Sequence, residues 1–229
     1  MSTNPTARAW AEIDAQSLLN NARTVQSSIG PDARLLPMVK ADAYGLGVTE
    51  AAQVLFDFVE RDLYDASAGA FRGRQVGTGT SWWTDPTLYA DRQAALMRAC
   101  LAASTVLEDD RAKRLALQAG DALLAHCIDD NGGVRHVCGA QNSDVSGLLA
   151  DQALAALALW ELGQVSGEVR FADAVDRVAR YMEDRLGGPV AFYNRAEPVG
   201  PLPRFFSHRD AGRPAGNALA LSFYGRRGD

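Results

Sequence analysis

The sequence lacks any apolar run approaching the roughly 18 residues that a membrane-spanning helix needs. It also lacks the long basic stripe that is typical of nucleic-acid-binding proteins. The first ten residues, MSTNPTARAW, contain no apolar segment of the signal-peptide kind. With 3 cysteines in 229 residues, the chain has too few for a disulfide framework. These absences predict a protein of the reduced cytoplasm that binds neither membranes nor nucleic acid.

What the chain does contain is an ordinary globular mixture. Hydrophobic residues make up 47% and charged residues 22%, and the formal net charge is −5. This composition excludes disordered acidic tails and fibrous proteins, and it supplies enough apolar material for a sizeable core. The length predicts one or two domains.

The first quarter of the chain alternates between strand and helix patterns. Residues 10–13 (WAEI) indicate a short strand, and residues 15–28 carry apolar side chains at helical spacing. Residues 34–40 (RLLPMVK) are apolar enough for a buried strand, and residues 48–55 begin a second helix. This β-α-β-α order is typical of a parallel sheet or barrel.

From residue 56 onward the pattern changes to long alanine-rich and leucine-rich helices, with no convincing series of strands. Between pairs of helices lie glycine-containing loops, each of which predicts a turn followed by a short extended piece. The predicted helices cover residues 86–105, 109–127, 147–165 and 168–186, and the three loops include residues 69–72, 132–135 and 187–192. Pro86 is expected at the first position of its helix.

The helix pairs repeat along the chain. Residues 88–91 (LYAD) align with residues 148–151 (LLAD) at an offset of 60. A period of this length built from two helices indicates a helical array or an α/α toroid. Because a closed six-hairpin toroid would need roughly 360 residues, the chain is expected to hold a partial one. Its two ends should expose apolar helix faces and cause self-association.

The most specific motif is VKADAYGLG at residues 39–47, which lies downstream of RAWAEID at residues 8–14. On these residues, segment 8–55 resembles the N-terminal pyridoxal phosphate segment of alanine racemase, which has a TIM-barrel type fold. The resemblance implies that Lys40 forms a Schiff base with pyridoxal phosphate and serves as a base, and that Tyr44 reaches toward the cofactor phosphate.

The racemase resemblance is incomplete, both within the motif and downstream of it. The family usually carries histidine where this chain has Leu46. A (β/α)₈ barrel takes about 250 residues, and only its first two βα units have a counterpart here. No segment matches the family's phosphate loop or its second, tyrosine base. Racemase chemistry therefore has one base but not the other.

The remainder of the chain carries a second, more diffuse resemblance. Segment 57–224 is similar to the helical region of thioredoxin-domain-containing proteins of the spermatogenesis-associated type, which is a six-hairpin glycosidase-like toroid. The residues that carry it are 61–65 (RDLYD), 69–71 (GAF), 87–91 (TLYAD), 149–154 (LADQAL) and 214–218 (PAGNA). Together the two resemblances imply a mainly α fold, in which a racemase-like β-α-β-α domain at residues 1–55 precedes an α/α hairpin domain at residues 56–229.

Candidate site residues in the helical part leave several interpretations open. A glycosidase would need two carboxylates, although acids at helix starts are more often caps. Trp82 and Trp83 could stack on a sugar or form an apolar lid. The spacing of His126, Cys127, His136 and Cys138 matches no standard zinc pattern, so no metal site is predicted. The available acids are Asp85, Asp91, Asp129, Asp130, Asp144 and Asp151.

These patterns support three functional hypotheses. The first is a helical α/α-toroid protein without demonstrable catalysis, which carries a truncated racemase-like segment. The second is a pyridoxal phosphate-dependent alanine racemase-type isomerase that uses Lys40. The third is a carbohydrate-binding or carbohydrate-processing toroid. The expected small-molecule partner is accordingly an amino acid or a sugar.

Overall fold

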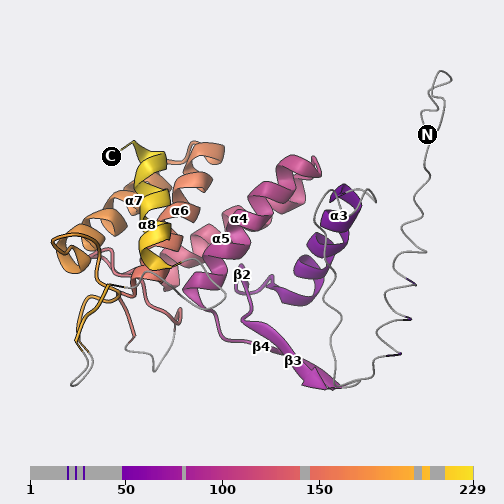
Figure 1. Cartoon of the computed structure of the whole chain (residues 1–229). Coiled ribbons are helices and arrows are strands. Elements are labelled where there is room, and N and C mark those ends of the chain that lie inside the picture. Colours follow the sequence, from indigo (N-terminus) through magenta and orange to yellow (C-terminus); the bar gives the residue numbers. More distant parts are fainter. Residues whose placement is uncertain are drawn as a thin grey trace, which may run out of the picture.

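The structure is a computed structural model, and it describes residues 48–78, 81–139, 145–198, 203–206 and 215–228, together with Asn20, Thr24 and Ser28. Six α-helices dominate the described residues (Figure 1). They are α3 (Val48–Phe58), α4 (Ala90–Val106), α5 (Asp110–His126), α6 (Leu149–Ser166), α7 (Val169–Tyr181) and α8 (Gly216–Arg227). The first two predicted strands and the helix over 15–28 lie almost wholly outside the described residues, as do Lys40 and Tyr44.

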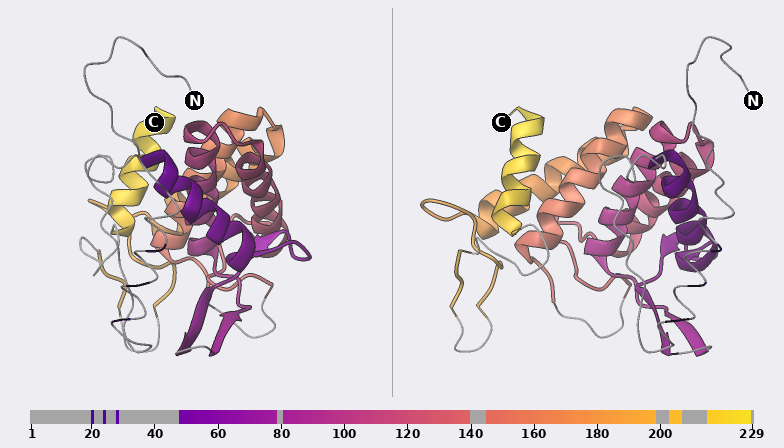
Figure 2. Two further views of the ribbon diagram at one scale, coloured as in Figure 1. Left: turned by 90° about the vertical axis from the view of Figure 1, so that its right-hand side faces the viewer. Right: turned by 45° about the vertical axis from the view of Figure 1, so that its right-hand side comes forward.

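The helices form two rows. We call α4, α6 and α8 the inner row, because α6 packs against α4 on one side and against α8 on the other. The outer row consists of α3, α5 and α7, of which α5 covers α4 and α7 covers α6. Inner and outer helices alternate along the chain, and the inner helices run in the same direction (Figures 1 and 2). This arrangement confirms the prediction of a mainly α, partial α/α toroid.

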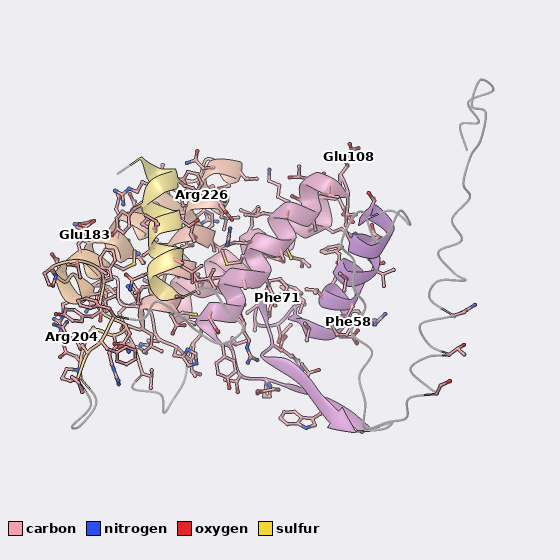
Figure 3. The ribbon with its side chains drawn as sticks, viewed as in Figure 1. Phe58, Phe71, Glu108, Glu183, Arg204 and Arg226 are labelled. Atoms are coloured by element: carbon pink, nitrogen blue, oxygen red, sulfur yellow. A yellow bond between two sulfur atoms is a disulfide. The ribbon has the colours of Figure 1, made fainter. Side chains whose placement is uncertain are left out.

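Small side chains allow the rows to pack closely. Alanines fill much of the interface, and Phe71, Phe171 and Phe223 are fully buried in the core (Figure 3 labels Phe71). Gly120 of α5 lies so close to α6 and α7 that a Cβ there would collide with Leu162 and press on Phe171. Close-packed interiors of this kind leave no space for an added methyl group.

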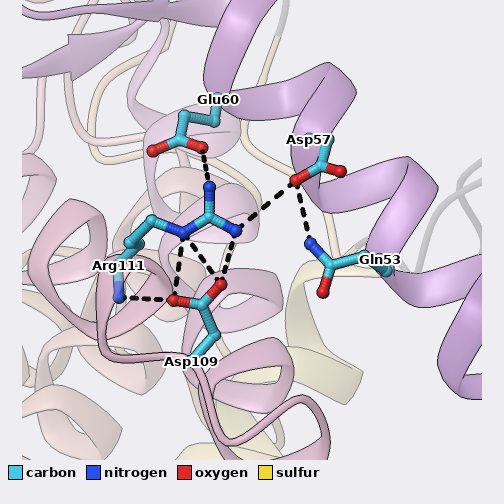
Figure 4. A network of polar contacts seen from close by, with 5 residues as sticks. All are labelled: Gln53, Asp57, Glu60, Asp109 and Arg111. Atoms are coloured by element: carbon cyan, nitrogen blue, oxygen red, sulfur yellow. Dashed lines mark hydrogen bonds and ion pairs between the residues drawn. The ribbon is translucent and has the colours of Figure 1, made fainter.

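Ion pairs connect neighbours within each row. In the inner row, the Glu161 carboxylate of α6 accepts from Arg98 of α4 and from Arg226 of α8, at 2.7 and 3.1 Å. In the outer row, Arg111 of α5 reaches Asp57 and Glu60, which lie at the end of α3 and in the π-helical turn η1 (Val59–Leu63) (Figure 4). These pairs are partly exposed, so each adds little stability. They show which helices lie next to one another.

Each inner helix begins with an amide side chain that holds a neighbouring backbone segment. Gln93 of α4 exchanges two hydrogen bonds with the backbone of Phe71. Gln152 of α6 accepts from the Val134 N–H and donates to the Gly132 carbonyl. On α8, Asn217 binds the N–H and carbonyl of Phe192. We call these three residues the amide clamps.

The amide clamps correct the repeat register proposed from sequence. The caps Tyr89 and Leu148, like the clamps Gln93 and Gln152, are separated by one residue fewer than the predicted 60. Asp151 therefore corresponds to Arg92 rather than to Asp91. The short LYAD and LLAD strings aligned by letter, whereas the hydrogen bonds that define the repeat come from the glutamines after them.

The predicted helix boundaries are largely confirmed for α5, α6 and α7, the last of which continues as the π-helical turn η2 (Met182–Leu186). The predicted start of α4 at Pro86 is wrong. Tyr89 is still extended, because it pairs with Val137, and the helix begins at Ala90. The Asp109 side chain caps α5 by accepting from the Arg111 N–H at 2.8 Å.

Short strands lie at the end of the bundle where the inner helices begin. Strand β1 (Tyr64–Asp65) pairs with β2 (Ala70–Phe71), and β3 (Arg74–Thr78) pairs with β4 (Ser81–Asp85) in a projecting hairpin (Figure 1). The sequence patterns did not predict this hairpin, although they predicted the extended pieces after the glycine turns. Those pieces appear as β2 and as the bridges Ile128–Val134 and Gly187–Phe192.

The turn between β1 and β2 contains a strongly bound carboxylate. Asp65 accepts hydrogen bonds from the hydroxyl and N–H of Ser67 and an ion pair from Arg72. These donors favour the charged form and lower the pKa of Asp65 from 3.8 to about 2, with the Ser67 hydroxyl as the largest cause.

Candidate functional site

A polar cluster lies where α4 and α6 begin. Asp91 is the second residue of α4, and Asp151 is the third residue of α6. His136 comes from the segment after α5, which folds back along the start of α4. That segment is fixed by backbone contacts: the His136 carbonyl accepts from the Ala90 N–H at 3.0 Å, and Val137 pairs with Tyr89.

The three side chains approach one another closely. His136 Nδ1 lies 2.9 Å from Asp151 Oδ2. One potential ligand atom from each of Asp91, His136 and Asp151 lies within 4.8 Å of the others. The two aspartates are buried, at 8% and 2% exposure, whereas a third of the His136 side chain is exposed. The ring is therefore the member of the cluster that solvent and ligands reach most readily.

The position of the aspartates explains how two carboxylates can be buried together. Both lie in the first turn of a helix, where unpaired backbone N–H groups and the helix dipole favour negative charge. The contact with Asp151 fixes the imidazole orientation, and the carboxylate can stabilise an imidazolium. An aspartate behind a histidine in this way is a recurrent arrangement for proton transfer.

The donor set could also hold a divalent cation. One imidazole nitrogen and two carboxylates are ligands that transition-metal ions accept. In such a site the protein would supply three ligands on one side, and the ion would polarise a bound oxygen atom.

A disulfide lies next to this cluster. Cys127 and Cys138 are bonded, with their Cα atoms 4.4 Å apart, and they close the loop that carries His136. The sequence analysis predicted no disulfide framework, and it did not anticipate this single bond. The residues are distant enough in sequence that only the return of the loop after α5 brings them together. Because structural disulfides are commonest in oxidising compartments, the cytoplasmic location stays a prediction.

The third cysteine, Cys100, is a buried thiol of low reactivity. Cys100 lies in α4 with 1% exposure, and burial raises the pKa of its thiol to about 12. Because only the thiolate is reactive and this thiol stays protonated, Cys100 serves as a small apolar side chain in the core.

The structure separates the other candidates that the sequence had grouped together. Of the five candidate acids that the structure describes, only Asp91 and Asp151 join His136. Asp129 forms an ion pair with Arg135 at 2.7 Å, and Asp85 accepts from the Thr87 N–H at 3.0 Å. Trp83 is 56% exposed on β4, which lies in the projecting hairpin. Lys40, Tyr44 and Asp144 fall outside the described residues, as does His208.

The sequence analysis considered His136 only together with His126, Cys127 and Cys138. The signal that could have found its partner was present, because Asp151 belongs to the first turn of a predicted helix and His136 precedes it by a loop. No spacing rule, however, shows which of six acids a returning loop will meet.

Part of the chain matches a known family. Residues 13–67 match the alanine racemase N-terminal domain. The chain is 48% identical over 46 residues to alanine racemase from Synechocystis sp. and 43% identical over 53 residues to serine/alanine racemase from Enterococcus gallinarum. These matches cover 20% and 23% of this chain but only 12% and 8% of the relatives. The racemase-like part is thus a small fragment of those proteins.

The helical part is similar in structure to another group. A sugar epimerase from a ruminal bacterium has a TM-score of 0.60 at 13% identity, over 80% of this chain and 49% of that one. Cellobiose 2-epimerase from Bacillus thermoamylovorans gives 0.60 at 10% identity, over 78% and 47%. A family 88 glycosyl hydrolase from Bacteroides vulgatus gives 0.56 at 13% identity, over 80% and 55%. The fold is shared, and the chain spans about half the length of these proteins.

The two sets of matches make the chain a hybrid of a racemase-like segment and a six-hairpin glycosidase-like helical part. The predicted join, near residues 54–57, lies within α3. The domain limits at residues 55 and 56 stay a prediction. Within the described part of the chain, none of the helices has the length and apolar character to cross a membrane.

Proposed function

We propose that the helical part binds a saccharide at the cluster of Asp91, His136 and Asp151. His136 is the group that exchanges a proton with the bound ligand. The observation that carries this proposal is the pairing of a partly exposed histidine with a buried aspartate, at 2.9 Å. Because Asp151 engages Nδ1, a ligand would meet the ring at Nε2. Similar folds in a sugar epimerase and in cellobiose 2-epimerase support a saccharide as the ligand.

Proton transfer fits the cluster better than hydrolysis. A glycosidase needs two carboxylic groups that both reach the scissile bond. Here Asp151 is 2% exposed and bound to His136, so it is poorly placed to meet a sugar. His136 could take the proton from the carbon next to the carbonyl of an open-chain sugar. The electron pair of the broken C–H bond then passes into an enediolate, and a returned proton completes the exchange.

Deuterium exchange tests the proposal. The protein is incubated with cellobiose, glucose or mannose in D2O, and the sugars are followed by NMR. We expect deuterium at the carbon next to the anomeric centre, and loss of this exchange in His136→Gln. His126→Gln is the matched control, because His126 is an exposed histidine at the end of α5. Exchange that survives in His136→Gln, or a wild type that neither binds nor exchanges any of the sugars, would contradict the proposal.

We further propose that the racemase-like segment gives this chain no racemase activity. The match of residues 13–67 to the alanine racemase N-terminal domain supports pyridoxal phosphate as the cofactor to test, with Lys40 and Tyr44 as the residues that would hold it. The matched region is 12% or less of the Synechocystis and Enterococcus racemases. When bound, the cofactor would supply an electron sink for proton removal from an amino acid. A cytoplasmic location belongs to the same set of proposals.

A further inference from the structure

The described helices form half of a ring whose two edges differ. Among the described helices, α3 and α4 lie at one edge and α8 lies at the other (Figure 2). Along the chain the order is outer, inner, outer, inner, outer, inner, from α3 to α8. An α8 helix placed beside α3 and α4 would continue this alternation without a break.

The edge formed by α3 and α4 carries an apolar groove. Its volume is about 360 Å³, and both helices line it. The walls include Leu55 and Phe56 of α3, and Leu96, Ala99 and Val106 of α4. Leu55 and Val106 are 56% and 52% exposed. Apolar side chains with this much exposure, gathered on both sides of one groove, indicate a surface made for contact.

Among the described helices, the groove lies where the alternation of rows would place a further inner helix. Within the described chain, α6 lies against both the inner helix α4 and the outer helix α7, and α4 lies likewise against α5 and α6. A helix in the groove would touch α3 and α4 in the same relation. A helix that continues the inner row at this place would need a small, apolar face.

The other edge presents such a face. On α8, the side chains of Ala218, Leu221 and Ser222 are exposed together with Gly225, at the spacing of one helix face. Leu221 is 76% exposed, the most exposed leucine among the large apolar residues of the described chain. Small residues on α4 and α6 already permit close packing within the inner row, so α8 offers the same kind of surface to a further neighbour.

We infer that two copies of this chain close the toroid, with α8 of each copy seated in the α3–α4 groove of the other. The two contacts are identical, because a twofold axis that coincides with the central axis of the ring relates the two copies. The assembly therefore closes at two copies. The cluster around His136 would then face the inner helices of the second copy across the mouth of the ring. The assembly itself does not depend on what the cluster binds.

Light scattering after size exclusion tests the inference on the full chain. We expect a mass of twice 24.5 kDa. Leu221→Arg and Ala99→Arg, on the two opposite edges, should each give monomers with wild-type circular dichroism, because an arginine in either surface buries an unpaired charge at both contacts. Ala125→Arg is the matched control, since Ala125 is an exposed alanine on the central outer helix α5, and it should remain dimeric.

Mixing the two monomeric variants distinguishes head-to-tail closure from other arrangements. In a mixed dimer, one contact carries both substitutions and the other is entirely wild type. The mixture should therefore regain a dimer peak that neither variant forms alone. A mixture that stays monomeric would overturn the inference, as would a monomeric wild type, which would mean that another segment of the chain fills the groove. A mass greater than two copies would exclude the closed ring.

Discussion

The amide clamp of α6 makes a quantitative prediction about stability. Gln152 is fully buried, and it satisfies the Val134 N–H and the Gly132 carbonyl in a buried loop. Gln152→Leu keeps the approximate size of the side chain but leaves both backbone groups without this partner. A buried polar group that loses its hydrogen bond costs about 1–3 kcal/mol. For two such groups we therefore expect the free energy of unfolding to fall by about 2–6 kcal/mol, a large part of the total for a typical domain.

Urea denaturation followed by circular dichroism measures this loss. Gln164→Leu is the control, because Gln164 is an exposed glutamine on the same helix and its replacement should change stability by less than about 0.5 kcal/mol. The reasoning would be refuted if the two variants unfolded at the same urea concentration with equal slopes. In that case water or other polar groups would have to satisfy the Val134 N–H and the Gly132 carbonyl at no cost in stability.

Three further outcomes are expected. Because the pKa of Asp65 is lowered from 3.8 to about 2, its contribution to stability is present above about pH 4 and disappears as the pH falls toward 2. Asp65→Asn should remove that part of the acid sensitivity, as measured by denaturation at about pH 5, above the window, and at about pH 2.5, within it. Thiol titration with Ellman's reagent should find no reactive thiol in the native protein, one after unfolding and three after reduction, because Cys100 is buried and Cys127 is bonded to Cys138. Purified protein with excess pyridoxal phosphate should interconvert L- and D-alanine no faster than Lys40→Ala, and saturable turnover lost in that variant would contradict the proposal.

The helices could be predicted from sequence because their information is local. The apolar spacing in α5, α6 and α7 gave boundaries close to those observed, and the toroid followed from the repeat of helix pairs. The start of α4 could not be predicted, because Tyr89 is held extended by Val137, a residue far along the chain. The β3–β4 hairpin was missed because its strands are short and pair only with each other.

The candidate site depended on contacts that no local pattern encodes. Asp91 and Asp151 were recognised only as two of six acids at helix starts or in loops. His136 was compared with its nearest cysteines, where ligand spacing was the available rule. The site exists because the segment after α5 turns back along α4, fixed by the Ala90 N–H and by the Cys127–Cys138 bond. That path is set by tertiary packing rather than by propensity.

The amide clamps have a consequence for how this architecture can vary. Each clamp fastens the backbone next to an inner helix by a side chain of that helix, so the anchoring points are independent of the loops between them. Residues can be inserted into or removed from those loops without shifting the helices or the ends of the segments they hold. We therefore expect the helices to tolerate loops of different length, because the three amide clamps keep each bound backbone segment at a fixed position beside its inner helix.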